Sequence, residues 1–118
     1  MTAQYDIIIR GGLVVDGTGS QPKQADVAIA GGIIAAVGKI DGDAREVIDA
    51  SGLLVTPGFI DLHTHYDGQA VWSQRMNPSS SHGVTTVILG NCGVGFAPCR
   101  PTDRDLMCAT MEGVEDIP

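Results

Sequence analysis

Two histidines separated by one residue are the first side chains whose type and spacing indicate chemistry. His63 and His65 close an apolar segment that starts at Phe59, and the sequence predicts a short buried strand over 59–65. Side chains two residues apart in a strand point the same way, so both imidazoles would project side by side. Such a pair at a strand end is suited to one divalent metal ion. An isolated His-x-His pair can equally be two ordinary polar residues at a strand end.

A cysteine follows the next apolar segment, which spans 84–89. Cys92 lies within Gly90-Asn-Cys-Gly-Val-Gly95, where glycines let the backbone approach a ligand closely. A thiolate binds zinc strongly and stays deprotonated on it. The alternative is a buried cysteine with a purely structural role. Because the ends of neighbouring parallel strands lie side by side, we expect Cys92 to join His63 and His65 in one metal site.

Three further polar residues have weaker claims to a role in this site. Asp61 faces the same way as the histidines but lies one layer deeper, which favours a supporting role over metal binding. Asp67 either contacts substrate or shapes its loop, and the second role is favoured. His82 precedes the second apolar segment, remote from the expected site, and a structural role is favoured.

The elements that must position these residues are predicted to be βα repeats. From residue 57 onwards the chain reads as strand, polar connection, strand, glycine-rich loop and then a helix that starts near Pro101. This order is typical of a parallel sheet covered by helices. The sequence therefore predicts that residues 57–118 form one structural unit, with the chemical side chains at the carboxyl ends of its strands.

Short strands dominate residues 1–56, the other predicted domain. The pairs Gly11-Gly12 and Gly31-Gly32 each interrupt a β-rich run and each predict a two-residue hairpin. A third stretch, 46–55, adds two more short strands. We expect a small antiparallel β module of about six strands.

Composition narrows the class of protein and its partners. The chain has 118 residues, of which 43% are hydrophobic, enough for an ordinary domain with a core. A net charge of −7 with only seven Lys and Arg argues against a nucleic-acid or anionic membrane surface. Apolar runs fall short of the roughly 20 residues of a membrane span, and the start lacks the features of a secretory signal. Three cysteines make a poor disulfide framework, so a cytoplasmic protein is expected.

Several motifs, taken in order, resemble the amino-terminal region of the amidohydrolase superfamily. The general ones are Gly11-Gly-Leu-Val-Val-Asp-Gly17, Pro57-Gly-Phe-Ile-Asp-Leu-His-Thr-His65 and Gly83-Val-Thr-Thr-Val87. Two others, Gly90-Asn-Cys-Gly-Val-Gly-Phe-Ala-Pro98 and Met111-Glu-Gly-Val-Glu-Asp-Ile-Pro118, resemble the D-aminoacylase (N-acyl-D-amino-acid deacylase) branch. The resemblance covers nearly the whole chain, and the Gly-Asn-Cys-Gly loop is its most specific part.

This resemblance implies a mixed fold and a hydrolytic function. The fold would be part of a β-sandwich followed by the first two strands of a (β/α)₈ metallohydrolase barrel, with one or two divalent ions, Zn²⁺ above all. His63 and His65 match the family's first-strand pair, and Cys92 matches the cysteine that replaces a carbamylated lysine in this branch. The reaction would be hydrolysis of the N-acyl bond of a small-molecule N-acyl-D-amino acid.

We expect the chain to be an incomplete part of such an enzyme. A (β/α)₈ barrel needs about 250 residues, and the residues after Pro57 supply about two of its eight units. In the family, two more histidines and the general-base aspartate come from later strands, so no catalytic residue is expected here. The chain alone should therefore be inactive, and its open strand edge favours a homo-oligomer.

Two alternatives remain. The first is a cyclic amide or imide hydrolase similar to dihydropyrimidinase, against which Cys92 speaks because those enzymes use a lysine ligand. The second is a non-catalytic fragment that forms a β-rich oligomer with idle metal residues.

Overall fold

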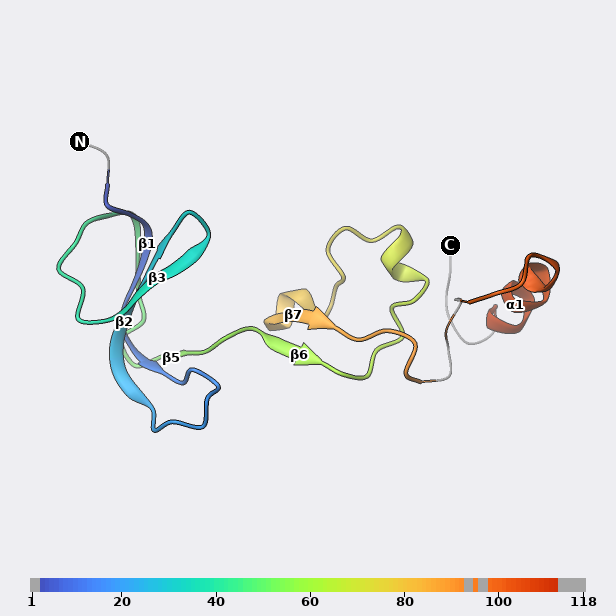
Figure 1. Ribbon diagram of the computed structural model, residues 1–118, viewed down its shortest axis with the longest axis horizontal. Helices are drawn as coiled ribbons and strands as arrows, with labels where there is room; N and C mark the ends of the chain where they lie inside the picture. Colours follow the sequence, from blue (N-terminus) through green and yellow to red (C-terminus); the bar gives the residue numbers. More distant parts are fainter. Residues whose placement is uncertain (1–2, 93–94, 96–97, 113–118) are drawn as a thin grey trace. The chain divides into compact units, whose positions relative to one another are not determined.

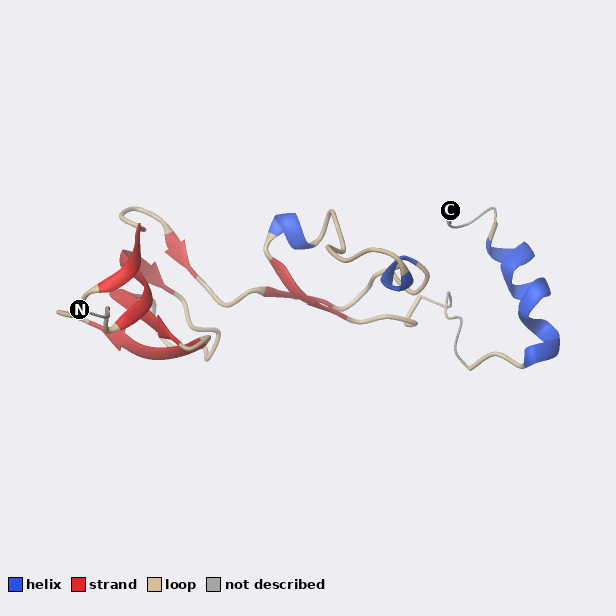
Figure 2. Cartoon of the chain, turned by 90° about the horizontal axis from the view of Figure 1, so that it is seen from above, coloured by secondary structure: helices blue, strands red, loops and turns tan. Residues whose placement is uncertain are grey.

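The structure is a computed structural model that describes residues 3–92, 95 and 98–112. The chain divides into two compact units, Met1–Pro57 and Gly58–Pro118. Strands make up most of the first unit, whereas the described part of the second contains the strands β6 and β7, long loops and the short helix α1 (Figures 1 and 2).

A five-stranded mixed sheet forms the first unit. Its strand order is β3-β2-β1-β4, and β5 also pairs with β1. The β1–β2 and β2–β3 pairs are antiparallel, whereas β4 and β5 both run parallel to β1. The predicted wholly antiparallel module is therefore wrong. The bounds are Tyr5–Val14 for β1, Lys23–Ala30 for β2, Ile33–Gly38 for β3, Ala44–Asp49 for β4 and Leu54–Val55 for β5.

The parallel pairing of β4 follows from the connection after β3. This connection crosses one face of the sheet, where buried Ile40 packs against Ile8 and Ala28. The chain then enters β4 on the far side of β1, running in the same direction as β1. A hydrophobic contact on the sheet face thus packs the crossover connection against β1 and β2.

The two Gly-Gly pairs have different structures. Gly31 and Gly32 form the predicted hairpin between β2 and β3, with φ of 59° and 76°, as a type I′ turn requires. The hairpin predicted at Gly11-Gly12 is wrong, because β1 continues through it with a bulge opposite β2. Gly11 has φ of 67°, and its N–H donates to Oδ1 of Asp26 at 2.8 Å. A side-chain acceptor thus satisfies the donor at the bulge.

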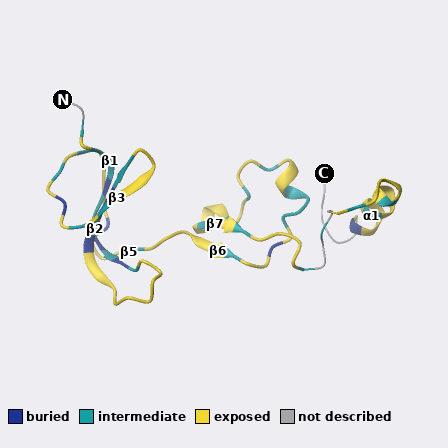
Figure 3. Ribbon diagram, viewed as in Figure 1, coloured by how far each residue is buried: buried dark blue, intermediate teal, exposed yellow. Residues whose placement is uncertain are grey.

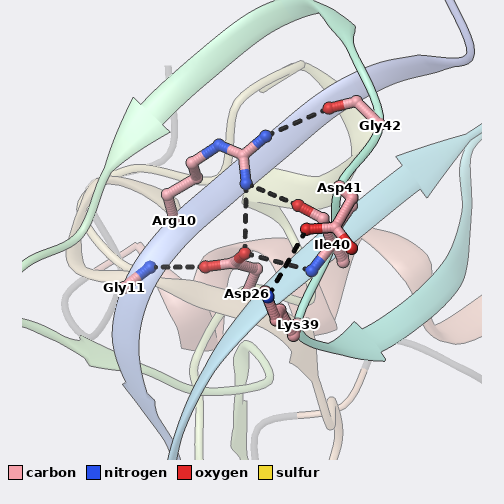
Figure 4. A network of polar contacts seen from close by, with 7 residues as sticks. All are labelled: Arg10, Gly11, Asp26, Lys39, Ile40, Asp41 and Gly42. Atoms are coloured by element: carbon pink, nitrogen blue, oxygen red, sulfur yellow. Dashed lines mark hydrogen bonds and ion pairs between the residues drawn. The ribbon is translucent and has the colours of Figure 1, made fainter.

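One ion pair ties this bulge to the crossover connection (Figure 4). The Arg10 guanidinium donates to Oδ2 of Asp26 at 3.1 Å and to the carbonyls of Ile40 and Gly42 at 2.8 and 3.1 Å. The N–H of Ile40 also donates to Asp26, at 3.3 Å. The Gly11 N–H, then that of Ile40 and the Arg10 charge hold the pKa of the Asp26 carboxyl below its ordinary value.

The second unit contains one pair of parallel strands, β6 (Phe59–Asp61) and β7 (Val84–Val87). Their arrows point the same way in Figure 1. The parallel pairing expected for βα repeats is thus confirmed for these two strands. The helix predicted near Pro101 begins with a 3₁₀ turn and continues as α1 (Arg104–Met111). The 3₁₀ turns are Gln69–Val71, Ser80–His82 and Pro101–Asp103.

The strand predicted over 59–65 is shorter and more exposed than expected. It ends at Asp61, and Phe59 and Ile60 are 59% and 62% exposed (Figure 3). Parallel strands are normally covered by helices on both faces, and within the described residues these two side chains lack that cover. No helix in the described part of the chain is long and apolar enough to span a membrane.

The Asp26 network predicts a specific loss of stability in one variant. We expect Asp26→Ala to lower the free energy of unfolding by about 1–3 kcal/mol, because it leaves the donors of Gly11, Ile40 and Arg10 without their acceptor. Since the folded-state pKa of Asp26 lies below 3.8, its contribution is complete above that pH and is lost as the pH falls through the folded value. Urea unfolding near neutral pH and below pH 3.8 measures both effects.

Asp41→Ala is the matched control, since that side chain is 85% exposed and its contact with Lys39 is 3.9 Å long. We expect it to change stability by less than about 0.5 kcal/mol at either pH. Equal losses in the two variants would contradict the role assigned to Asp26.

Candidate metal centre

Parallel pairing brings two loops to the same end of β6 and β7. Asp61 is paired with Val87, and the N–H of Ile88 donates to the carbonyl of Asp61 at 2.9 Å. Both strands finish at this level, and the segments that follow them carry His63, His65 and Cys92. The adjacent strand ends therefore place these three side chains on neighbouring loops.

The two histidines lie beside each other, but strand alternation is not the reason. Because β6 ends at Asp61, His63 and His65 belong to the following loop. The Asp61 carboxylate accepts the backbone N–H of His63 at 3.1 Å, which holds the chain in a turn where the ladder stops. The two imidazole centroids lie 6.1 Å apart, with 21° between the ring planes. The two rings lie next to each other, as predicted, but a loop rather than a strand positions them.

Cys92 completes a group of three potential metal ligands. One ligand atom from each of His63, His65 and Cys92 lies within 4.8 Å of the others. In a tetrahedral zinc site, bonds of about 2.0–2.3 Å place ligand atoms about 3–4 Å apart, which is close to the separations within this group. Both imidazoles are exposed and the thiol is partly buried, which leaves the group open to an ion and to further ligands. Two nitrogens and one sulfur form a donor set that suits zinc.

The residues with weaker claims to a role in the metal site lie at different places in the second unit. Asp61 contacts the backbone of His63, and Oδ2 of Asp67 accepts the N–H of Gly90 at 3.1 Å. His82 is exposed, in the 3₁₀ turn before β7, at the opposite end of that strand from Cys92. Cys99 and Cys108 are free thiols and belong to no metal-ligand group among the described residues. The roles predicted for Asp61, Asp67 and His82 stay predictions.

Two polar residues near the site had no assigned role from sequence. Thr64 is 6% exposed, and its hydroxyl donates to the carbonyl of Ile88 at 2.9 Å. Asn91 donates from Nδ2 to the carbonyl of Leu62. The one sequence feature that could have indicated a role for these two residues is their position. Thr64 lies between the two histidines, and Asn91 directly precedes Cys92.

Comparison with known proteins identifies the family. The sequence model of the amidohydrolase family matches residues 46–118, which include β6, β7 and all three potential ligands. The chain therefore belongs to the amidohydrolase family, as its motifs indicated.

Several similar proteins are named as a D-aminoacylase or as an N-acyl-D-glutamate deacylase. A D-aminoacylase of Alcaligenes xylosoxydans xylosoxydans is 44% identical over 108 residues, which are 87% of this chain and 22% of the relative. A D-aminoacylase structure described as having a binuclear metal centre superposes with a TM-score of 0.75 at 45% identity, over 87% of this chain and 23% of that one. An N-acyl-D-glutamate deacylase from Bordetella bronchiseptica, in complex with zinc and a phosphonate inhibitor, gives 0.76 at 34% identity, over 96% and 27%.

The chain is also similar to proteins that are named as allantoinases rather than deacylases. An allantoinase of Escherichia coli is 42% identical over 89 residues, which are 71% of this chain and 19% of the relative. This chain thus spans about a fifth to a quarter of the length of the proteins it matches.

The geometry of the three ligands predicts metal binding by the chain itself. We expect nearly one zinc per chain after purification without chelator, and loss of that zinc in Cys92→Ala, because two imidazoles alone bind zinc more weakly. Elemental analysis per mole of protein measures it. Cys108→Ala is the matched control, since Cys108 is an exposed thiol outside the group. Equal zinc in all three proteins, or none in any, would refute the assignment.

Proposed function

We propose that this chain is the amino-terminal segment of a zinc-dependent amidohydrolase that hydrolyses the N-acyl amide bond of N-acyl-D-amino acids. The observation that carries this proposal is the group formed by His63, His65 and Cys92, whose ligand atoms lie within 4.8 Å of one another. Family membership and the named activities of the D-aminoacylase and deacylase relatives support the reaction class. The substrate is then a small molecule with an acylated amine.

The fold proposed for the whole protein extends from the two units. We infer that the mixed sheet of Met1–Pro57 belongs to a β-sandwich and that β6 and β7 are the first two strands of a (β/α)₈ barrel. Active sites of such barrels lie at the carboxyl ends of the strands, which is where the three ligands follow β6 and β7. The superposition on D-aminoacylase supports this inference.

The ligand group defines what these residues would do in catalysis. His63, His65 and Cys92 would hold a divalent ion, which when bound lowers the pKa of a coordinated water and polarises a carbonyl oxygen. The exposed imidazoles leave that side of the site accessible to a substrate and to ligands from other strands. A general base is still required to move the proton, and we propose that an aspartate from a later strand supplies it, as the family resemblance implies.

Cyclic amide hydrolysis is the second candidate reaction. The similarity to allantoinase over 71% of the chain favours it. The Gly-Asn-Cys-Gly loop argues for the deacylase reaction instead, because enzymes of the dihydropyrimidinase type use a lysine ligand where this loop offers Cys92. The D-aminoacylase likeness also extends further along the chain, over 87% of it.

Activity measurements with a longer protein test the proposed reaction. We expect a zinc-loaded protein that continues beyond residue 118 through the remaining barrel strands to hydrolyse N-acetyl-D-amino acids in preference to their L-enantiomers and to cyclic imides. His63→Ala should lower kcat/KM by about 100-fold or more, because loss of a metal ligand weakens binding of the ion, which lowers the barrier by several kcal/mol. Preferred opening of cyclic imides would support the second candidate.

The isolated 118-residue chain should show no zinc-dependent release of amino acid in the same assay, since it lacks the proposed general base. Turnover by the pure chain would contradict that part of the proposal. An absence of bound zinc would instead favour the view that this segment is a non-catalytic oligomer with idle ligands.

We also propose that the chain self-associates. Within the described residues, no further strand pairs with either edge of the β6–β7 sheet. Five apolar side chains in and just after these strands are 40–66% exposed: Phe59, Ile60, Leu62, Ile88 and Leu89. Unpaired edges and exposed apolar side chains favour association with another copy. Light scattering over a range of concentrations should give a mass that rises above that of one chain. A constant monomer mass would rule out this proposal.

A further inference from the structure

The loops that carry the ligands are joined by side chains beyond the last ladder bond. Three hydrogen bonds cross between them. The Thr64 hydroxyl donates to the Ile88 carbonyl at 2.9 Å, Nδ2 of Asn91 donates to the Leu62 carbonyl, and the Gly90 N–H donates to Oδ2 of Asp67 at 3.1 Å. In each bond a side chain of one loop satisfies a backbone group of the other. We call Thr64, Asp67 and Asn91 the clasp.

The clasp residues are interleaved with the metal ligands in sequence. Thr64 lies between His63 and His65, while Asn91 directly precedes Cys92. The clasp therefore fixes the register of the histidine loop against the cysteine loop at three points. Backbone pairing cannot do this, because the ladder of β6 and β7 has already ended.

Asp67 acts where the cysteine loop is most constrained. Gly90, two residues before Cys92, has φ of 76°, a left-handed conformation that glycine adopts readily. The Asp67 carboxylate receives the N–H of this residue, and its other oxygen lies 3.6 Å from the position that a Cβ on Gly90 would occupy. Both carboxylate oxygens thus lie close to the Gly90 turn.

We propose that Thr64, Asp67 and Asn91 are positioning residues that hold Cys92 within bonding reach of His63 and His65 before metal binds. This inference rests on the proposed metal function and adds the residues that preorganise its ligands. A loop that samples other conformations binds metal with an affinity reduced by the fraction of time it spends in the competent one. Loss of groups that support metal ligands typically lowers metal affinity by about 10- to 100-fold.

A cobalt titration of the 118-residue chain isolates this role. Co²⁺ bound to a thiolate gives a sulfur-to-metal charge-transfer absorption, which reports Cys92 ligation separately from histidine binding. We expect Asp67→Ala to weaken Co²⁺ binding about 10- to 100-fold and to reduce that absorption per bound ion. Asp67→Asn keeps an acceptor oxygen for the Gly90 N–H and should stay close to the wild-type chain.

Two further variants complete the design. Asn91→Ala removes an exposed side chain of the same clasp, so it should also weaken Co²⁺ binding about tenfold and provides a test if Asp67→Ala does not fold. Asp105→Ala is the matched control, because this exposed carboxylate in the first turn of α1 belongs to neither loop. Circular dichroism of each apo-protein verifies that it is folded.

The possible results separate this inference from the function on which it rests. Wild-type affinity and absorption in both Asp67→Ala and Asn91→Ala would overturn the positioning role and leave the metal site intact. Equal losses in Asp67→Ala and Asp67→Asn would assign the effect to charge, and would overturn positioning by this hydrogen bond. A wild-type chain without the charge-transfer absorption would overturn the proposed metal function and the positioning role together.

Discussion

The parallel hydrogen bonding of β6 to β7 is the constraint on which the candidate site depends. Parallel strands leave a sheet at the same edge, so the loops after Asp61 and Val87 start side by side although a long connection separates the strands. That connection is itself anchored, since the hydroxyl groups of Tyr66 and Ser79 lie 2.9 Å apart and the Ser79 N–H donates to Tyr66 at 3.2 Å. A short ladder and one anchored connection thus start the two loops side by side, and the side-chain hydrogen bonds beyond the ladder join the loops that carry the imidazoles and the thiol.

Both units use side chains to hold backbone where regular pairing stops. In the first unit, Asp26 accepts the Gly11 N–H at the bulge of β1, and Arg10 donates to two carbonyls of the crossover connection. In the second unit, Asp61 and Asp67 accept backbone N–H groups in the ligand loops. A carboxylate is effective in this role because a charge-assisted hydrogen bond is stronger than a neutral one. The acidic composition of the chain is therefore partly structural in origin.

Membership of the amidohydrolase family and possession of its chemistry are separate properties. The described part of the chain contains one group of three potential metal ligands, and the family model matches residues 46–118, yet the chain spans about a fifth of the D-aminoacylase that it resembles. A metal site of this kind needs only a few atoms in the loops that follow two strands, whereas hydrolysis also needs a base and a substrate pocket. A short chain can hold such a group of potential metal ligands, because the loops after β6 and β7 are joined by their own hydrogen bonds.

The sequence by itself indicated the three potential metal ligands, the family and the parallel pairing of the two strands that precede them. His63, His65 and Cys92 were recognisable because side-chain type and local spacing can be read directly from the sequence. The hairpin at Gly31-Gly32 was recognisable for the same reason. Only the tertiary structure decided that β1 runs through Gly11-Gly12, since a bulge and a hairpin share the same glycine signal until Asp26 from another strand is in place.

Tertiary structure likewise decided that β6 ends at Asp61, that β4 runs parallel to β1, and that Thr64 and Asn91 join the two ligand loops. Each of these features depends on a contact between residues far apart in the chain. Local propensity contains no information about which distant backbone group a side chain will meet, because packing selects that partner.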